Sequence, residues 1–514
     1  MQSNRTKLML ASFLTLVASG VGFATRAASG GIWESALGID GSQFGAIMGA
    51  GFLGFGIMIF LGGFIVEAMG YKTVLIVAFL LHLVSAVMLI VAPGLFEGWS
   101  EGGDTAAATT KVFSLLYWSA FLFSICQGLY EAVINPLIAQ IYPENKTHYL
   151  NILHAGWPAG MIVGGLFAAG FMGSECWFIE VPWQWALASF AIFVLAYGLM
   201  ALPEKFPPTV AQGASSFGKL FSCFYSWPFL LLIVLHGLIG YMELGVDSWV
   251  TKLMENLLPN AVIILVYTSA LMFILRFFAG PIVHQVNPIG LLLISSVIAC
   301  AGLLWLGSGI TSIAVLFAAA TFYSLGKAFL WPTMLAVAGE RYPLSGAVAM
   351  GALGAAGMIT VGQIGGPAIG HKQGYNMSAK LEADAPATFE RFAAEEETDF
   401  MGMYAFKPIV AERLAAANGV EIGADGSVKD TSSIENAALL SDEDKKLLLD
   451  NVATDAKAVQ EANLHGGYRA LTLTAYVPAA MAVGFLILLL YYKAIGGYKV
   501  LQVNDDGSLT EAAH

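Results

Sequence analysis

The sequence predicts an all-α membrane protein whose twelve transmembrane helices form two pseudo-symmetric six-helix bundles. Its mean hydropathy is +0.71 and only 12% of its 514 residues are charged, whereas soluble domains average about 25%. Twelve apolar runs follow one another along the chain, and each is long enough to cross a hydrocarbon core of about 30 Å as a helix. A sequence repeat between the two halves of the chain indicates that the helices are divided into two bundles.

The apolar runs define the expected spans. The first run is too long for the apolar region of a signal peptide and no small-residue cleavage site follows it, so we expect it to be retained as a helix. The twelve spans cover residues 7–33, 42–67, 73–95, 112–141, 146–172, 183–202, 226–252, 260–285, 288–307, 310–338, 345–370 and 468–493.

Basic residues in the short loops predict the orientation, because cytoplasmic loops are enriched in lysine and arginine. One side holds only Lys111 and Lys252 in short loops. The other side, which includes both termini, holds Arg5, Lys7, Lys72, Lys146, Lys205, Lys219, Arg341, Lys493 and Lys499. We therefore expect an integral plasma (inner) membrane protein with cytoplasmic N- and C-termini. The acidic loop 371–466 is then extracytoplasmic.

The domain boundaries follow from a connector rich in proline, glycine and serine between spans six and seven. The motif "AGMIVGG" (Ala159–Gly165) is echoed by "AGMITVG" (Ala356–Gly362), so spans four and five resemble spans ten and eleven. Two repeated halves joined by a cytoplasmic loop are the layout of a secondary transporter with its site between the halves. The expected parts are a bundle of residues 1–202, a cytoplasmic linker of 203–225, a second bundle of 226–493 with the insertion 371–466, and a cytoplasmic tail of 494–514.

Small residues form a ladder in span five, where Gly156, Gly160 and Gly164 recur every four residues. Span eleven has Gly362, Gly366 and Gly370 at the same spacing. Glycines at this spacing let helix backbones approach closely. The ladders predict either static helix packing or a seam along which the two bundles move.

Charged residues inside the spans are functional candidates, because an ionisable group in the membrane is costly. Spans one, four, seven and ten carry Arg26, Glu131, Glu243 with Asp247, and Lys327. Two of these have plain alternatives: Asp247 could be a solvated carboxylate near the outer surface, and Lys327 could reach a helix end or a water pocket. Spans five and eight add His154 and Arg276.

Polar residues on these helices fall on single faces. Gln127, Glu131 and Asn135 are spaced by four in span four, which stacks their side chains along one stripe. A carboxylate on such a stripe beside a wet cavity could carry a proton. Arg26 is its expected partner, or alternatively an anchor for the substrate.

Two prolines, Pro136 and Pro332, are expected to bend spans four and ten next to the cavity. Trp331 precedes the second proline. The stretch "NILHAGWP" in span five places Asn151, His154 and Trp157 at three-residue steps. Aromatic and amide side chains suit sugar rings, although tryptophan at a helix end is also an ordinary membrane-interface anchor.

The insertion 371–466 predicts two short helices with a hairpin between them. "KPIVAERLAAANG" is expected to begin at Pro408 and end at Gly419, and "SDEDKKLLLDNVATDAKAVQ" to begin at Ser441 as its N-cap. "VEIGADGSVKD" is the expected hairpin. A small cap over the outer mouth and an inert decoration are equally compatible with this pattern.

Several function classes find no support in the sequence. Basic patches for nucleic acid are absent, and the four cysteines have neither metal-site nor disulfide spacing. Hydrolase and ATP-binding motifs are absent as well. We therefore expect no enzyme activity, no metal and no cofactor. The expected partners are a small-molecule solute and the lipid bilayer, with the chain as a monomer.

These features together resemble the major facilitator superfamily, over essentially the whole membrane part of the chain. Its loop signature is similar to "GFIVEAMGYK", with Gly63, Glu67, Gly70 and Lys72 in the matching places. The resemblance implies that these residues help to latch the inner gate. Glu67 replaces the usual aspartate, and Ala68 and Tyr71 replace two usual basic residues.

Within the superfamily, "GLYEAVINP" and "YMELGVDSW" are similar to motifs of the fucose and glucose symporters, which implies proton coupling by Glu131. The departure is Arg26, which stands where the sugar family has an aspartate. Arg26 in span one and Glu131 in span four also resemble symporters of sugar acids and other carboxylates, and Arg276 could complete a two-arginine clamp on an anion.

We therefore predict a proton-coupled symporter of a sugar or similar small polar solute that works by alternating access. The alternatives are a symporter of an organic anion that uses Arg26 and Arg276, a sensor that binds solute without transporting it, and sodium as the coupling ion. Glu131 and Arg26 are the expected coupling residues. The candidate substrate contacts are Gln127, Asn135, Asn151, His154, Trp157, Glu243, Asp247, Trp249, Arg276, Lys327 and Trp331.

Overall fold

The structure is a computed structural model, and it describes residues 2–39, 41–101, 105–173, 176–209, 217–254, 262–423, 426–437, 440–503 and 508–511. The chain is predominantly helical, as predicted. Within the described residues, eleven helical segments are long and apolar enough to cross a membrane, and Ile263–Arg276 is a shorter apolar helix. Together they correspond to the twelve expected spans.

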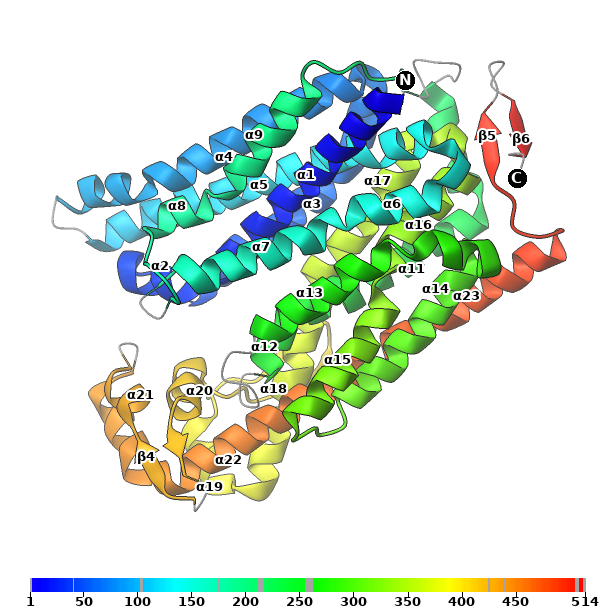
Figure 1. Ribbon diagram of the computed structural model, residues 1–514. Helices are drawn as coiled ribbons and strands as arrows, with labels where there is room; N and C mark the ends of the chain where they lie inside the picture. The colour runs from blue at the N-terminus through cyan, green and yellow to red at the C-terminus, as the bar shows by residue number, and fades with distance from the viewer. Residues whose placement is uncertain are drawn as a thin grey trace.

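The first half of the chain forms a bundle of long helices (Figure 1). Span five is split into α6 and α7, and span six into α8 and α9. The elements are α1 (Gln2–Ala27), α2 (Gly30–Leu37), α3 (Gly41–Met69), α4 (Tyr71–Ser100), α5 (Thr105–Ile141), η1 (Pro143–Asn145), α6 (Lys146–His154), α7 (Gly156–Phe171), α8 (Trp183–Leu187) and α9 (Phe190–Ala201).

The second half begins after a short 3-10 helix, η2 (Phe217–Tyr225). Two of its spans contain a wide π-helical turn, η3 or η5, and such turns occur frequently at functional sites. Its elements are α11 (Trp227–Gly240), η3 (Tyr241–Gly245), α12 (Val246–Met254), α13 (Val262–Arg276), α14 (Ala279–Leu306), α15 (Ile313–Lys327), α16 (Leu330–Arg341), η4 (Pro343–Ser345), α17 (Gly346–Thr360), η5 (Val361–Gly365), α18 (Gly366–Asp384), α22 (Asp442–Thr474) and α23 (Tyr476–Ala494).

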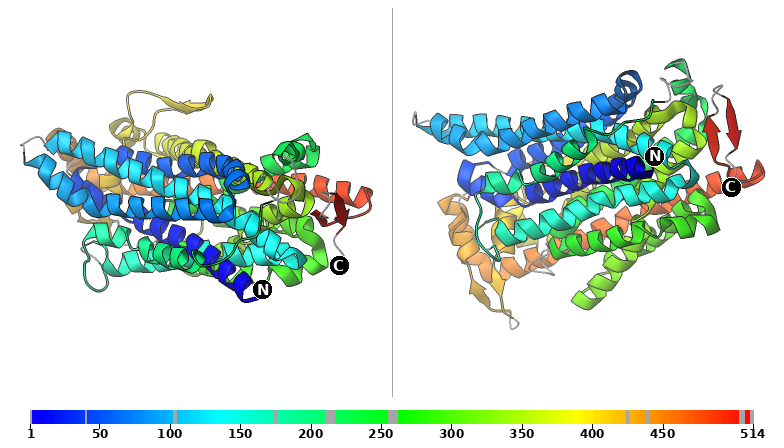
Figure 2. Two further views of the ribbon diagram at one scale, coloured as in Figure 1. Left: turned by 90° about the horizontal axis from the view of Figure 1, so that it is seen from above. Right: turned by 45° about the horizontal axis from the view of Figure 1, so that its top comes forward.

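The insertion lies at the end of the molecule opposite the two termini (Figure 1; Figure 2, right). It has its own apolar core, which includes Leu381, Phe392, Ile434 and Val459. Its elements are α19 (Pro386–Phe392), the hairpin β1 (Thr398–Phe400) and β2 (Met403–Phe406), α20 (Ala411–Asn418), the hairpin β3 (Glu421–Ile422) and β4 (Val428–Asp430), and α21 (Ser432–Glu435). After the membrane part, the tail forms the hairpin β5 (Leu501–Val503) and β6 (Leu509–Glu511).

The expected insertion boundaries at 371 and 466 do not coincide with helix ends. Helix α18 continues to Asp384, and α22 runs without interruption from Asp442 to Thr474. The predicted N-cap is confirmed, since the Ser441 side chain accepts a hydrogen bond from the Asp444 backbone N–H at 3.0 Å. The predicted hairpin is also confirmed, but the helix expected at Pro408 begins only at Ala411.

Spans one and ten are also broken rather than continuous. Span one ends at Ala27, because the Ser29 hydroxyl bonds the Arg26 carbonyl at 2.7 Å and two glycines follow. Span ten ends at Lys327 and resumes at Leu330. Pro332 therefore lies in the first turn of α16, where proline is tolerated, and the break precedes it.

The glycine ladder of span five brings α7 against α1 at backbone contact distance. A Cβ added to Gly160 would lie 2.3 Å from the Val17 carbonyl oxygen, and one added to Gly156 would lie 2.6 Å from the Phe13 oxygen. The ladder of span eleven is looser, since a Cβ at Gly366 would meet nothing nearer than 3.5 Å. Only the first ladder is a tight helix crossing along its length.

Gly160→Ala should destabilise the protein, because α1 and α7 must separate to admit the methyl group. Overpacking of this kind costs about 1–3 kcal/mol, which would be measured as a lower thermal unfolding temperature in detergent. Gly49→Ala is the matched control, since an added Cβ there would have no atom within 4 Å. Equal stability of the two variants would show that the crossing is not tight.

Candidate functional site

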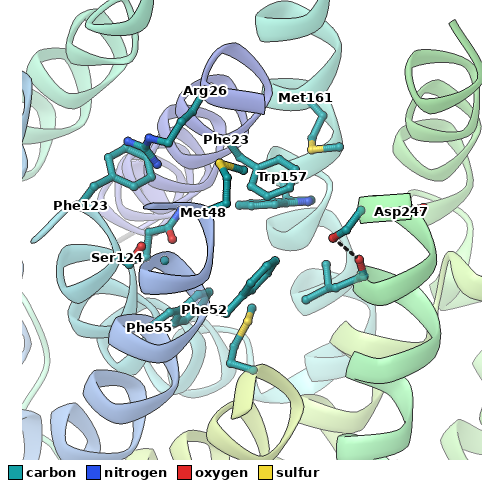
Figure 3. A pocket seen from close by; sticks show the side chains of 15 residues that line it. Phe23, Arg26, Met48, Phe52, Phe55, Phe123, Ser124, Trp157, Met161 and Asp247 are labelled. Carbon is teal, nitrogen blue, oxygen red and sulfur yellow. Dashed lines mark hydrogen bonds between the residues drawn. The ribbon is translucent and has the colours of Figure 1, made fainter. Parts of the chain in front are cut away.

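The centre of the molecule contains two adjoining chambers lined by residues of both halves. The Arg26 chamber, of about 610 Å³, is lined by Phe23, Arg26, Met48, Gly51, Phe52, Phe55, Phe123, Ser124, Gln127, Trp157, Met161, Leu244, Asp247, Ser248 and Met358 (Figure 3). The Glu131 chamber, of about 370 Å³, is lined by Phe55, Glu131, His154, Trp157, Glu243, Leu244, Arg276, Trp331 and Met358. The chambers share four of these residues, so they are parts of one central site.

A chain of hydrogen bonds runs along the Glu131 chamber. The Asn135 amide donates to the Glu131 carboxylate (3.2 Å), and its Oδ1 lies 2.8 Å from His154 Nε2. The stripe predicted from the sequence spacing thus places Glu131 and Asn135 one helical turn apart on α5, where α6 meets them. All three side chains are buried. The Glu131 carboxylate is therefore bonded to an amide, and it forms no ion pair with a described cation, although Arg276 lines the same chamber.

Arg276, the last residue of α13, joins the two halves. Its guanidinium donates to the backbone carbonyls of His154 in the first half and Ala328 in the second, the latter at 2.8 Å. Both carbonyls lie four residues before a proline, Pro158 and Pro332, which has no N–H to complete the helical hydrogen bond. Arg276 thus satisfies two buried carbonyls that the prolines leave without helical partners.

The third guanidinium nitrogen of Arg276, Nη2, forms an ion pair with Glu243 at 3.2 Å, and both side chains are buried. Glu243 lies in the π-helical turn η3, which widens the helix at the chamber wall. The second carboxylate oxygen of Glu243 has no hydrogen-bond partner in the described part of the chain. A buried carboxylate oxygen is costly to leave unpaired, so this atom is available to a proton, a water molecule or a solute.

A second ion pair lies in the same half. Lys327, at the end of α15, pairs with Asp247 of α12 and lies 5.3 Å from the centre of the Tyr323 ring. The Asp247 side chain is only 10% exposed. Both residues thus lie inside the protein. Asp247 is not a solvated carboxylate at the outer surface, whereas Lys327 does lie at a helix end, as the last residue of α15, with its side chain buried.

Arg26 lies on the opposite side of its chamber from Asp247 (Figure 3). Its guanidinium stacks over the Phe123 ring at 4.5 Å, and its side chain is buried. It forms no ion pair with Glu131 or with any other carboxylate whose side chain the structure describes. The ion pair considered from the sequence is therefore not formed in this conformation, because Glu131 faces the neighbouring chamber.

Four predicted contacts line neither chamber: Asn135 and Lys327, whose partners are given above, and Asn151 and Trp249. The Asn151 amide donates to the Thr147 carbonyl of its own helix and to the Thr333 hydroxyl of the other half. Trp249 packs on Gly370, where an added Cβ would lie 2.8 Å from the indole ring. Sequence reasoning missed the apolar lining, which includes Phe23, Phe52, Phe55, Phe123, Met48, Met161 and Met358. These residues carry no sequence signal that separates a chamber wall from a packed core.

The end of the molecule that carries the two termini is closed by contacts between the halves. Glu67 accepts a hydrogen bond from the Ala347 N–H, at the start of α17, at 3.2 Å. Gly63 lies so close to α17 that an added Cβ would be 3.0 Å from the Ala347 oxygen. Gly70, with a φ of 83°, forms the turn into α4, and Lys72 donates to the Glu204 carbonyl. The four residues of the gating motif thus gather at this closed end.

A second closing contact centres on Glu340, which the sequence analysis did not single out. Glu340 accepts hydrogen bonds from Thr147 of the first half (2.8 Å) and from Tyr498 of the tail (2.7 Å). Burial raises the pKa of Tyr498, so its phenol stays protonated and donates. Lys146 donates to the Gly339 carbonyl beside it. The only sequence signal is that both "IYPEN" and "RYPLS" end a span at the same point of the repeat.

Thr147→Val should weaken the closed end, because it removes a hydrogen bond to a buried carboxylate at the interface. Such bonds contribute about 1.5–3 kcal/mol, so the ratio of open to closed molecules should rise about tenfold or more. Spin-label distances between α6 and α16 would measure the ratio. Thr73→Val on the exposed surface of α4 is the control, and an unchanged distance distribution in Thr147→Val would contradict the role of this contact.

Comparison with known proteins assigns the chain to a family. The sequence matches the Major Facilitator Superfamily over residues 8–367. The chain therefore belongs to this superfamily, whose members are membrane transporters and not enzymes. No curated protein matches the sequence.

Three solved structures illustrate the fold. The E. coli fucose:proton symporter FucP has 18% identity and a TM-score of 0.55, covering 71% of this chain and 91% of its own. The proton:xylose symporter XylE has 14% identity and a TM-score of 0.60, covering 74% and 91%. The human organic anion transporter MFSD10 has 16% identity and a TM-score of 0.52, covering 74% and 95%. At these identities the likeness establishes the fold, and the predicted fold class is confirmed.

Proposed function

We propose that this protein is a proton-coupled solute symporter that works by alternating access. The observation that supports this most directly is the hydrogen-bonded chain from Glu131 through Asn135 and His154 to Arg276, which crosses between the two halves. A rearrangement of the halves must break or remake this chain. A proton on Glu131 would change the strength of one of its links, which is the requirement for coupling.

Alternating access is supported by the distribution of contacts between the halves. Glu67 with Ala347 and Thr147 with Glu340 hold the terminus-bearing end closed. Each contact is a small number of hydrogen bonds, so opening this end costs a limited free energy. We propose that this end faces the cytoplasm of a cell with the protein in its plasma (inner) membrane, and that the insertion lies outside.

Glu131 is the proposed proton carrier. Its carboxylate has one amide partner and no cation within ion-pair distance among the described residues. Binding a proton therefore breaks no ion pair. Glu243, by contrast, is engaged by Arg276. We therefore assign protonation to Glu131 and the link between the two halves to Arg276, whose guanidinium Glu243 holds in place.

Two substrate classes are candidates. A sugar is favoured by the motifs shared with sugar symporters, and two of the similar structures are named as fucose and xylose symporters. An organic anion is favoured by Arg26, because its guanidinium lines a chamber and has no carboxylate partner among the described residues.

Transport by the purified full chain in proteoliposomes tests this function. Neutral sugars and organic acids would be supplied in turn, and a pH-sensitive dye inside the vesicles would report proton entry. Proton uptake that starts when a solute is added is the expected result. Solute uptake that neither moves protons nor responds to a pH gradient would overturn proton coupling, and binding without uptake would favour a sensor.

A further inference from the structure

We propose that the transported solute is an amphiphilic monoanion, with one carboxylate or similar acidic group and an apolar body, and that it binds in the Arg26 chamber with its acid on Arg26. This inference rests on the proposed symport function and specifies its substrate class. It is carried by three observations: the pairing of the buried cations, the composition of the chamber wall, and the places of its few polar groups.

The first observation concerns the three buried cations in or next to the central chambers, Arg26, Arg276 and Lys327, two of which already have carboxylate partners. Arg276 pairs with Glu243, and Lys327 pairs with Asp247. Arg26 has an aromatic ring as its neighbour and no described carboxylate. A buried guanidinium is stabilised well by a planar anion that accepts two of its hydrogen bonds. An anionic solute would supply that partner.

The second observation is the wall of the Arg26 chamber, which holds five aromatic rings and three methionines among fifteen lining residues. A sugar presents several hydroxyl groups, and each would lose its water without gaining a partner against such a wall. An apolar or aromatic body instead gains from contact with rings and thioethers. The wall therefore favours an amphiphile over a polyol.

The third observation is where the polar groups of the chamber lie. The Asp247 carboxylate is already paired with Lys327, and the Ser248 hydroxyl donates to the Leu244 carbonyl. Ser124 and Gln127 make no side-chain hydrogen bond in the described part of the chain, and both lie on α5 beside Phe123, over which Arg26 stacks. Figure 3 shows Arg26, Phe123 and Ser124 on one side of the chamber and Trp157 with Phe23 near its centre.

The chamber thus has one polar corner and an apolar remainder. An acid group in the corner could accept hydrogen bonds from Arg26, Ser124 and Gln127, while the body of the solute lies against Phe52 and Trp157. Trp157 and Phe55 also line the Glu131 chamber, so a bound solute would be adjacent to the proposed proton site. A proton and a monoanion together carry no net charge across the membrane.

Binding of matched acids and amides tests the inference. The probes are 4-phenylbutyrate, indole-3-acetate and octanoate, each compared with its own primary amide, and L-fucose and D-xylose as polyols. Calorimetric titration into the purified full chain would measure affinity. We expect at least one acid to bind about tenfold or more tightly than its amide and than either sugar.

Substitutions of Arg26 test whether the preference for acids over amides arises at the polar corner of the chamber. Arg26→Gln should remove the acid-over-amide preference, while Arg26→Lys should keep part of it as a point charge. Lys219→Gln removes an exposed cation far from the chamber and should keep all of it. Since Arg26→Lys retains the buried charge, it provides the test if Arg26→Gln fails to fold, which size-exclusion chromatography would report.

Three results would overturn the inference: no acid prefers the protein over its amide, a sugar binds more tightly than every acid, or the preference survives in Arg26→Gln. The proposed function fails separately. If an acid binds through Arg26 but its uptake moves no protons, the substrate class stands and proton coupling falls. If a sugar is taken up with protons, proton coupling stands and this inference falls.

Discussion

Glu131→Gln should abolish proton-driven accumulation of solute while leaving solute exchange intact. A gradient of one pH unit is worth about 1.4 kcal/mol per proton, so one proton per solute supports about tenfold accumulation in the wild type. The amide cannot take up the proton, but it can keep a hydrogen bond to Asn135. Accumulation should therefore fall to a ratio of about one, whereas counterflow of labelled solute persists. Uptake into proteoliposomes with and without a pH gradient measures both.

The matched control is Glu97→Gln, which removes an exposed carboxylate from α4 and should leave accumulation unchanged. Accumulation that survives in Glu131→Gln would assign the proton to another group. Glu243 is then the next candidate, because one of its carboxylate oxygens has no partner among the described residues.

Arg276→Gln should strongly destabilise the protein. It leaves Glu243 as a buried carboxylate without its cation, and it removes the donors that serve the His154 and Ala328 carbonyls. Removing one partner of a buried ion pair costs about 3–5 kcal/mol. Thermal unfolding in detergent, followed by the loss of monodisperse protein, measures the effect. A much smaller loss would show that water replaces the guanidinium.

Two second-site changes test the reason for this loss. Glu243→Gln in the Arg276→Gln background removes the uncompensated charge and should recover part of the stability. Pro332→Ala restores an N–H four residues after Ala328 and should recover a further part, since the freed carbonyl regains its helical donor. In the wild-type background neither change should stabilise. If the stability change of each double variant equals the sum of the changes in its two single variants, Arg276 does not act through Glu243 or the Ala328 carbonyl.

The insertion 371–466 contains features that local sequence signals predict and one feature that they do not. Ser441 was predictable as an N-cap, and the β3–β4 hairpin from its turn residues, because both depend on neighbours a few positions away. The 33-residue length of α22 could not be predicted from such signals. The helix begins with acidic residues and ends with apolar ones, so its two parts look like separate segments in the sequence. That helix is completed by packing on α18 and on the core of the insertion.

The candidate site likewise contains some features that local sequence signals predict and others that they do not. The stripe Gln127, Glu131 and Asn135 follows from the helical period alone. The separation of Arg26 from Glu131 does not, since it depends on how α1 and α5 are rotated and on the Phe123 ring that holds the guanidinium. Ion pairs such as Arg276 with Glu243 join residues 33 positions apart, and sequence spacing gives no distance between them.

The sequence by itself determined that this protein spans a membrane with two repeated helical bundles, and which helices carry ionisable groups. Hydrophobic length and the cost of buried charge act on each segment separately, so they can be evaluated residue by residue. Only the tertiary structure decided which charges neutralise one another, which carbonyls Arg276 serves, and that Arg26 faces an apolar chamber. Those outcomes depend on side chains from different helices meeting at distances of a few ångströms, and the packing of the whole bundle sets those distances.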